Sequence, residues 1–402
     1  MKYIVILADG MADLPIEELE HKTPLEFTST PAMNIMASYG EMGMVKTIPD
    51  GFAPGSDVAN LAVLGYDPEK YYTGRSALEA VSIGVALSER DVTYRVNLVT
   101  LSDEQNFADR TMVDYSSDEI TTEESAELIA AVDEALGSDK YRFYAGTSYR
   151  NLCVYTGGKS QVEMTPPHDI SGKTIGDFLP KGEEAEAILD LMKRSTAVLQ
   201  DHPVNRRRAQ RGLHCANAIW FWGQGTSPSL PLFEEKYGLR GAMISAVDLL
   251  KGIGKCAGMQ VIEVEGATGD AYTNYAGKAE AALHALKNGA DFVYLHFEGP
   301  DESGHHGEVY TKLAAIERID QVAAYLMCEL GKESEPYSIM LLPDHPTPIA
   351  TRTHSAAPVP YTIFRSGSQK RARRKFGETQ AAQTGIYREP GYLLMDQFLQ
   401  RN

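Results

Sequence analysis

The stretch KAEAALHALKNGADFVYLHFEGPDESGHHG, residues 278–307, carries a helix, a break and a strand in direct succession. Residues 278–286 are rich in Ala and Leu, which favour helix, and Gly289 ends that helix. Residues 291–297 are an apolar run of strand length that leads into Gly299, Pro300 and Asp301. We therefore predict a strand that is buried on both faces, with an acidic residue just beyond its carboxyl end.

The same order of elements recurs on either side of this stretch. Residues 3–8 form an apolar run that ends at Asp9 and Gly10. Apolar residues at helical spacing between positions 313 and 322 lead to a strand at residues 337–342, which is followed by Asp344 and His345. Residues 359–364 supply one more strand. Alternating helices and strands are typical of α/β proteins, so we predict a core with a largely parallel sheet flanked by helices.

Residues 86–199 have a different pattern, with strands expected at 93–101, 141–144 and 151–155. A helix is expected at residues 122–136, with Thr121 as N-cap and Glu124 completing a capping box, and a second at 183–199. The acid- and histidine-rich motifs lie outside this block. We therefore predict an inserted α+β cap domain at residues 86–199 that binds substrate, and a core domain made of residues 1–85 and 200–402. Residues 219–221, with Trp220, would return the chain to the core sheet.

Composition limits the class of protein. The chain has 402 residues, 43% of them hydrophobic, and a formal net charge of −17, which suits two domains and argues against nucleic acid as a partner. The short basic run at residues 370–375 is interpreted as a solvated loop. The four cysteines stand singly, so neither a zinc cluster nor a disulfide framework is indicated. No apolar run approaches the roughly 20 residues that span a bilayer, and we expect a cytoplasmic protein without a membrane partner.

Carboxylates and imidazoles gather at the predicted ends of the core strands. The carboxyl ends of parallel strands meet at one edge of a sheet, which is where ligands bind in such folds. The side chains expected to meet there are Asp9, Asp301, His305, Asp344, His345 and His354. This mixture of oxygen and nitrogen donors suits Mn²⁺, Zn²⁺ or Co²⁺ better than Mg²⁺, which prefers oxygen alone. The pattern predicts a site for two divalent metal ions that supports phosphoryl transfer.

A nucleophile for that transfer is present in the stretch Pro54-Gly55-Ser56-Asp57. Gly55 permits a tight turn, and residues 58–64 are expected to begin a helix, which places Ser56 at a helix N-terminus. Free N–H groups and the positive end of the helix dipole favour a phosphate at such a position. Considered alone, Ser56 is better explained as a simple N-cap. A metal ion on the Ser56 hydroxyl would lower its pKa and make it a nucleophile near neutral pH.

The motifs together resemble a known family. The stretch Ser56-Asp57-Val58-Ala59-Asn60-Leu61, the opening Asp9-Gly10, residues 301–305, Asp344-His345 and His354 closely resemble the archaeal-type phosphoglycerate mutases that work without 2,3-bisphosphoglycerate. Those enzymes belong to the alkaline phosphatase superfamily. The resemblance implies an alkaline-phosphatase-like core and extends over the whole chain.

The resemblance also implies roles for individual residues. One metal ion would be held by Asp9, Ser56, Asp344 and His345, and the other by Asp301, His305 and His354. Ser56 would accept the phosphoryl group and form phosphoserine, after which the dephosphorylated acid would reorient under a closed cap and take the group back on a different hydroxyl. No 2,3-bisphosphoglycerate would be needed as cofactor.

The match weakens in the predicted cap. Archaeal mutases carry an Asp-Arg-Arg-Ala-Gly-Arg-like stretch there, whereas this chain has Asp109-Arg110-Thr111-Met112-Val113-Asp114-Tyr115, and a bacterial branch proposed to phosphorylate homoserine has a similar segment. Arginines bind carboxylates and phosphates through a bidentate fork, so their loss bears on the choice of substrate more than on metal chemistry. No phosphate-cradling G-x-x-x-x-G-K-[ST] loop is present to support direct use of ATP.

The sequence therefore predicts a metal-dependent phosphotransferase that interconverts 3- and 2-phosphoglycerate. Phosphoryl transfer to homoserine, phosphomonoester hydrolysis and a non-catalytic metal-binding role remain as alternatives. The partner is a small phosphorylated metabolite, and a homo-oligomer is compatible with the sequence. The side chains considered for substrate binding are Asp57, Arg110, Arg150, Arg208 and Lys251.

Overall fold

The computed structural model describes residues 1–158, 162–369 and 372–400, so the first two residues of the basic run at 370–375 lie outside the described part. The chain forms two compact units. Unit 1 comprises Met1–Tyr72 and Ser229–Asn402, and unit 2 comprises Thr73–Pro228.

Unit 1 is built on an eight-stranded sheet. Its strands follow in the order β11 (Gln260–Val261), β10 (Gly241–Ile244), β12 (Phe292–Phe297), β1 (Lys2–Ala8), β13 (Tyr337–Leu342), β14 (Val359–Arg365), β2 (Glu41–Val45) and β15 (Tyr387–Arg388). Neighbours from β11 to β13 are parallel, β14 is antiparallel to both of its neighbours, and β15 is parallel to β2. The predicted largely parallel sheet is confirmed.

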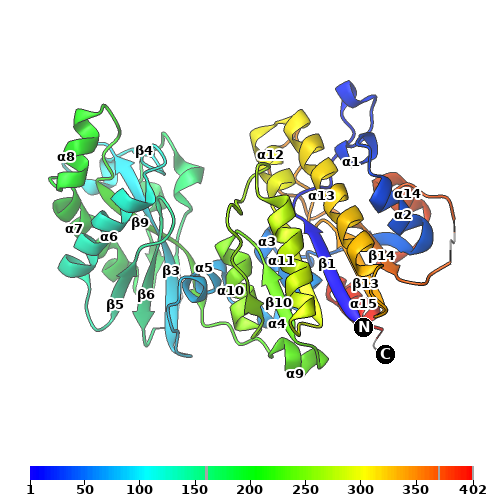
Figure 1. The fold of residues 1–402 in the computed structure, drawn as a ribbon. Coiled ribbons are helices and arrows are strands. Elements are labelled where there is room, and N and C mark those ends of the chain that lie inside the picture. Colours follow the sequence, from blue (N-terminus) through cyan, green and yellow to red (C-terminus); the bar gives the residue numbers. More distant parts are fainter. Residues whose placement is uncertain (159–161, 370–371, 401–402) are drawn as a thin grey trace. The chain divides into compact units, whose positions relative to one another are not determined.

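Helices cover both faces of this sheet. Alternate residues of β1, Ile4 and Ile6, join the core formed with α2 (Pro31–Tyr39), α11 (Tyr275–Lys287) and α13 (Val309–Leu330). Figure 1 shows α11 and α13 side by side in front of β1. Tyr3, on the other face of β1, packs edge-on against Phe398 of α15 (Leu394–Phe398) with ring centroids 5.5 Å apart. The central strands β12 and β13 are fully buried because both faces are covered, which explains their largely apolar sequence.

Shorter helices complete unit 1 at the strand ends and edges. They are α1 (Pro24–Phe27), α3 (Ser56–Val63), α4 (Pro68–Tyr71), α9 (Phe233–Tyr237), α10 (Asp248–Cys256), α12 (Gly299–His306) and α14 (Glu378–Gln383). Several begin as their sequences indicate. Asp67 accepts a hydrogen bond from the backbone of Glu69 at the start of α4, and Pro68 occupies the first turn, where it loses no helical hydrogen bond.

Unit 2 is an antiparallel α+β structure. Its main sheet joins β4 (Met112–Asp114), β3 (Asp91–Leu101), β6 (Arg150–Thr156) and β5 (Tyr141–Tyr144), and β9 (Ala218–Thr226) pairs with β3; the small strands β7 (Val162–Glu163) and β8 (Lys181–Gly182) pair with each other. Its helices are α5 (Arg75–Ser82), α6 (Thr122–Leu136), α7 (Ala185–Leu199) and α8 (Pro203–Gln210). A separate apolar core joins β3 and β9 to α6 and α7.

Two sequence predictions need correction here. Unit 2 is wider than the predicted insertion at residues 86–199, because α5 on one side and α8 with β9 on the other pack within it. Residues 219–221 do not return to the core sheet, since β9 pairs with β3 from Val99 opposite Ala218 to Val92 opposite Thr226. An apolar strand of this length suits either sheet, and only the pairing decides between them.

The predicted capping box of α6 forms only in part. Thr121 accepts a hydrogen bond from the backbone N–H of Glu124, as expected. The Glu124 carboxylate instead pairs with Arg208 and Arg211. Within the described residues, the structure contains no helix with both the length and the apolar character required to cross a bilayer.

Candidate active site

The acidic and histidine motifs meet at the carboxyl ends of three adjacent strands of unit 1. Asp9 follows β1, Asp301 lies in α12 just after β12, and Asp344 and His345 follow β13. Because β1 lies between β12 and β13 in parallel register, these side chains lie at one edge of the sheet. The structure thus brings together residues that are hundreds of positions apart in sequence.

Ser56 is the first residue of α3, directly after Gly55 at the N-cap. Its hydroxyl oxygen lies 3.1 Å from Nε2 of His345, and both side chains are buried. The serine is therefore at a helix N-terminus and beside an imidazole of the acid-histidine cluster. It does not serve as the N-cap residue that the local sequence also allowed.

The first group of side chains surrounds Nε2 of His345. That nitrogen lies 3.5 Å from Oδ1 of Asp9 and 3.4 Å from Oδ2 of Asp344. The other Asp344 oxygen accepts hydrogen bonds from the backbone N–H groups of Gly10 and His345, at 3.2 and 2.9 Å. Four predicted residues, Asp9, Ser56, Asp344 and His345, are thus within one small buried volume.

The second group is centred on Asp301. Its Oδ2 lies 3.2 Å from Nε2 of His305, and its Oδ1 lies 3.4 Å from Nε2 of His354. The two imidazole nitrogens face each other at 2.8 Å. Candidate ligand atoms of Asp301, His305 and His354 all lie within 4.8 Å of one another, as do those of Asp9, Asp301 and His345, so the two groups are adjacent.

Gly10 makes this close approach possible. Its φ is +60°, and a Cβ at this position would lie 2.5 Å from Oδ1 of Asp301 and 2.6 Å from Oγ1 of Thr347. A side chain here would be strained and would push against the metal-ligand candidates. The Asp9-Gly10 pair therefore combines a ligand with the space that its neighbours need.

Burial and neighbouring charges shift the pKa values of several groups in the site. Burial raises the pKa of Asp9 well above its usual value, and the carboxylates of Asp344 and Asp301 raise it further. Burial also acts to raise the pKa of Asp301, but hydrogen bonds from His305 and His354 outweigh it and hold that pKa well below the usual range. The same contact with Asp301 raises the pKa of His305 to about 9. Burial lowers the pKa of His345, which favours the neutral imidazole that a metal ion requires.

These residues fit a pair of divalent cations. Oδ1 of Asp9 is buried and has no hydrogen-bond partner among the described residues, although such atoms are normally satisfied. Three carboxylates, three imidazoles and a serine hydroxyl converge without a permanent positive side chain among them. This donor set is the one expected for a metal-dependent phosphatase-like centre.

Some neighbouring residues were missed by the sequence analysis. His296 of β12 is fully buried, contacts Oδ2 of Asp9 through Nε2 at 2.9 Å and contacts Ser245 through Nδ1 at 3.0 Å. Burial lowers its pKa to about 3, so the ring is neutral. Thr347 donates a hydrogen bond to Asp301. An imidazole inside an otherwise apolar strand was the sequence signal that could have identified His296.

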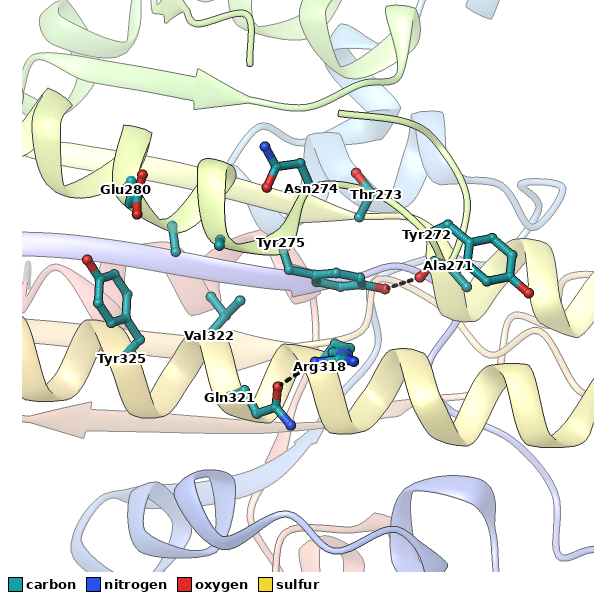
Figure 2. A pocket seen from close by; sticks show the side chains of 12 residues that line it. Ala271, Tyr272, Thr273, Asn274, Tyr275, Glu280, Arg318, Gln321, Val322 and Tyr325 are labelled. Atoms are coloured by element: carbon teal, nitrogen blue, oxygen red, sulfur yellow. Dashed lines mark hydrogen bonds between the residues drawn. The ribbon is translucent and has the colours of Figure 1, made fainter. Parts of the chain in front are cut away.

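One cavity of unit 1 reaches the predicted metal ligands, and a second pocket does not. A cavity of about 410 Å³ reaches His354 and is also lined by Asp13, Pro346 and Glu378. A second pocket, of about 520 Å³, lies between α11 and α13 (Figure 2), and its lining includes Tyr275, Arg318 and Tyr325. None of the seven predicted metal and nucleophile residues lines the second pocket.

The predicted substrate-binding residues fall in different places. In unit 1, Asp57 is next to the nucleophile and accepts a hydrogen bond of 2.5 Å from Tyr72, whereas Lys251 pairs with Glu263 at 3.0 Å. In unit 2, Arg110 donates to the backbone oxygen of Glu104 at 2.9 Å.

Arg208 has a structural setting. Its guanidinium is buried and bonds to Glu124 and to the backbone oxygens of Ser117 and His214. All of these partners belong to unit 2. The burial and the complete set of partners favour a role in holding α6 and α8 together over the predicted substrate contact.

Arg150 belongs to a cluster that the sequence did not reveal. Arg75 and Arg95 both pair with Glu79, at 2.9 and 3.0 Å, and Arg150 contributes to the same electrostatic environment. Burial lowers the pKa of Arg95 to about 10, which the like charges of Arg75 and Arg150 reinforce and Glu79 opposes. We call Arg75, Arg95 and Arg150 the arginine cluster. It carries more positive than negative charge.

Aromatic rings surround the arginine cluster. The Arg95 guanidinium lies 4.2 Å from the centre of the Trp222 ring, and Arg150 lies over Tyr149 at 4.8 Å. His168 meets Trp222 edge-on at 5.2 Å, and burial lowers its pKa with help from Arg95 and Arg150. Planar guanidinium groups are suited to binding a planar anion such as a carboxylate.

Comparison with known proteins identifies the family. The family model described as 2,3-bisphosphoglycerate-independent phosphoglycerate mutase matches residues 37–205, and that of type I phosphodiesterase / nucleotide pyrophosphatase matches residues 177–350. A probable 2,3-bisphosphoglycerate-independent phosphoglycerate mutase of Geobacter sulfurreducens is 49% identical over 403 residues and covers 100% of both chains.

Solved structures agree with this finding. A protein from Pyrococcus horikoshii is 31% identical, with a TM-score of 0.83, and the match covers 100% of this chain and 98% of that one. A cofactor-independent phosphoglycerate mutase from Thermoplasma acidophilum is 26% identical, with a TM-score of 0.67 and coverage of 100% and 99%. The resemblance seen in the sequence is confirmed: the chain belongs to the 2,3-bisphosphoglycerate-independent phosphoglycerate mutase family.

Proposed function

We propose that the protein interconverts 3-phosphoglycerate and 2-phosphoglycerate through a phosphoserine at Ser56. The observation that carries this proposal is the position of the Ser56 hydroxyl. It lies at the N-terminus of α3, 3.1 Å from His345, within the group that also contains Asp9 and Asp344. A nucleophile among metal-ligand candidates at a helix N-terminus has the surroundings that a transferred phosphoryl group requires.

The proposed metal ligands are those that the family resemblance indicated. Asp9, Ser56, Asp344 and His345 would hold one divalent ion, and Asp301, His305 and His354 the other, with Mn²⁺ or Zn²⁺ favoured by the mixed donors and Co²⁺ also suited to them. Bound there, the ions would supply Lewis-acid stabilisation of the phosphoryl oxygens and lower the pKa of the Ser56 hydroxyl.

The chain's own groups account for the transfer in two balanced steps. The Ser56 hydroxyl loses its proton and Oγ attacks phosphorus. The bond from phosphorus to O3 of the substrate breaks, and O3 takes up one proton, which leaves glycerate and phosphoserine. The 2-hydroxyl of glycerate then loses its proton and attacks the same phosphorus, the bond to Ser56 breaks, and Oγ of Ser56 takes a proton back. The positive end of the α3 dipole, where Ser56 is the first residue, would stabilise the phosphoryl group in both steps.

The arginine cluster of unit 2 is proposed to recognise the substrate carboxylate. Arg150, which the sequence analysis had singled out, is exposed and lies beside the buried Arg95. Planar guanidinium groups match a carboxylate through two parallel hydrogen bonds. This assignment makes unit 2 the substrate-binding domain and leaves the phosphoryl chemistry to unit 1. A small phosphorylated metabolite of the cytoplasm is the expected partner.

A single assay tests the proposal. The purified protein is loaded with Mn²⁺ and incubated with 3-phosphoglycerate, and phosphorus NMR follows the products. We expect 2-phosphoglycerate to appear without added 2,3-bisphosphoglycerate. The Ser56→Ala variant should lose the transfer, whereas Ser338→Ala, which removes a buried hydroxyl from β13, should retain it.

Three outcomes would contradict the proposal. Free phosphate released faster than the isomer forms would indicate a hydrolase. Transfer to homoserine from a phosphate donor, with no isomerisation of 3-phosphoglycerate, would indicate the alternative acceptor. Full isomerisation by Ser56→Ala would rule out the phosphoserine route.

A further inference from the structure

Asn60 connects the nucleophile to a metal-ligand candidate. It lies one turn after Ser56 on α3 and is fully buried. Its Nδ2 donates hydrogen bonds to the backbone oxygen of Ser56 at 2.8 Å and to Oδ2 of Asp344 at 2.9 Å. Its Oδ1 accepts a hydrogen bond of 2.6 Å from the hydroxyl of Tyr294 in β12. One side chain thus contacts α3, the end of β13 and β12.

The orientation of the Asn60 amide follows from its partners. The Ser56 backbone oxygen can only accept a hydrogen bond, and Oδ2 of Asp344 accepts the second one, so the NH₂ group faces both oxygens. The amide oxygen then faces Tyr294, whose hydroxyl must donate. Burial raises the pKa of Tyr294 well above its usual value, and Asp344 and Asp9 raise it further, so this donor keeps its proton. The other orientation of the amide would place oxygen against oxygen twice.

The hydrogen bond from Asn60 also limits the orientation of the Asp344 carboxylate. Oδ1 of Asp344 is already held by two backbone N–H groups. Oδ2 receives one hydrogen bond from Asn60 and lies 3.4 Å from Nε2 of His345. The carboxylate is therefore fixed at both oxygens, and the remaining lone pair of Oδ2 is free to point toward His345 and the metal position proposed above.

We propose that Asn60 is a positioning residue for one metal ion. Held in one orientation by Tyr294, it fixes the first turn of α3 at Ser56 and the carboxylate of Asp344 in the positions that this ion requires. This inference rests on the proposed function, because it takes Asp344 and Ser56 as ligands of that ion. Asn60 is not itself among the proposed ligands and would act through Ser56 and Asp344. Hydrogen-bond partners behind a ligand orient it and raise its affinity for the metal, typically by about 10- to 100-fold.

The test measures metal binding without turnover. Protein freed of metal by a chelator is titrated with Mn²⁺ in a calorimeter. We expect Asn60→Ala to weaken one of two Mn²⁺ sites by roughly 10- to 100-fold and to leave the other nearly unchanged. Tyr294→Phe removes only the hydroxyl that orients the amide, so its effect should have the same direction and be smaller.

Two matched controls separate positioning from general loss of packing. Asn205→Ala removes a buried asparagine of unit 2 whose side chain also bonds to two backbone oxygens and one backbone N–H. Tyr66→Phe removes a buried tyrosine hydroxyl of unit 1 that donates to the backbone of Pro231. Both controls should bind Mn²⁺ as the parent does, even if their thermal unfolding midpoints fall.

Activity gives a second readout. In the loaded enzyme, at Mn²⁺ concentrations that saturate each variant, Asn60→Ala should lower kcat for the mutase reaction with KM little changed, since Asn60 is proposed to act through Ser56 and Asp344. Unchanged Mn²⁺ affinity in both Asn60→Ala and Tyr294→Phe, or an equal loss in the controls, would overturn the inference. A parent protein without two Mn²⁺ sites would also overturn it. If the sites depend on Asn60 but 3-phosphoglycerate is not isomerised, the inference stands and the proposed function fails.

Discussion

Replacing Lys312 tests which contacts stabilise the edge of unit 1 where the proposed metal ligands lie. Its ammonium group is fully buried, lies 2.7 Å from Oδ2 of Asp13, whose carboxylate is also buried, and donates to the backbone oxygen of Thr347 at 2.8 Å. Thr347 in turn donates to Asp301. Burial lowers the pKa of Lys312, while Asp13 opposes that change. Lys312→Met would remove the cation and leave Asp13 as an unpaired buried charge.

The expected cost follows from that geometry. Removing one partner of a buried ion pair costs about 3–5 kcal/mol, since the remaining charge loses its compensation. At about 2–4 °C per kcal/mol for domains of this size, the unfolding midpoint of unit 1 should fall by roughly 6–20 °C in differential scanning calorimetry. The same substitution at Lys332, whose ion pair with Glu329 is exposed, should cost less than about 1 kcal/mol.

A double-mutant cycle checks the reason for the loss. Asp13→Asn keeps an acceptor for the backbone N–H of Ile349 but removes the charge. The double variant with Lys312→Met should therefore be more stable than the sum of the two single losses predicts, by well over 0.5 kcal/mol. Strict additivity, or a loss below about 1 kcal/mol for Lys312→Met alone, would refute the reasoning.

Three further predictions concern charge and metal. In the folded protein the pKa of His305 is raised to about 9 from its ordinary value of about 6.5, so this group stabilises the metal-free protein fully below pH 6.5 and loses that contribution as the pH rises through 9. The thermal unfolding midpoint of the metal-free protein should therefore fall across this pH window, while its affinity for Mn²⁺ rises. The opposite trends would contradict the assignment. Arg150→Met should lower kcat/KM roughly 10- to 100-fold, as expected for a lost hydrogen bond to a charged group. The control Arg207→Met, which breaks an exposed ion pair with Glu127, should leave kcat/KM unchanged. Equal kcat/KM values for the two variants would show that Arg150 does not bind the substrate. With free Mn²⁺ at about 100 times its dissociation constant, bound metal should stabilise unit 1 by about 2.7 kcal/mol, and adding a chelator should remove this stabilisation. The calorimetric transition of unit 2 should stay in place. A transition of unit 1 that does not move on chelation would argue against the metal site.

The core elements were predictable because their signals are local. The strands β1, β12 and β13 are largely apolar runs followed by polar residues, and this composition is typical of strands that are buried on both faces. The same pattern identified Asp9, Asp301 and Asp344 as residues at strand ends. The helix at Thr122–Leu136 was predicted to the residue from its capping signals.

The errors and omissions have a common cause in long-range contacts. Nothing within β9 tells whether its strand pairs with β3 or with the core sheet, so its return to the core was wrongly predicted. The sequence analysis overlooked Asn60, His296 and Lys312. The role of a buried polar residue depends on its hydrogen-bond partners, and these lie far along the chain, as Tyr294 does for Asn60. Arg208 looked like a substrate contact until its buried partners were known.

By itself, the sequence determined which segments form helices and strands and which chemical groups stand at their ends, because backbone preference and apolar periodicity act over a few residues. The tertiary structure alone decided that Ser56 lies 3.1 Å from His345, that Asp9 lies beside both acid-histidine groups, and that three arginines share one environment in unit 2. Those distances depend on strand order and on packing between segments hundreds of residues apart, and no local pattern encodes them.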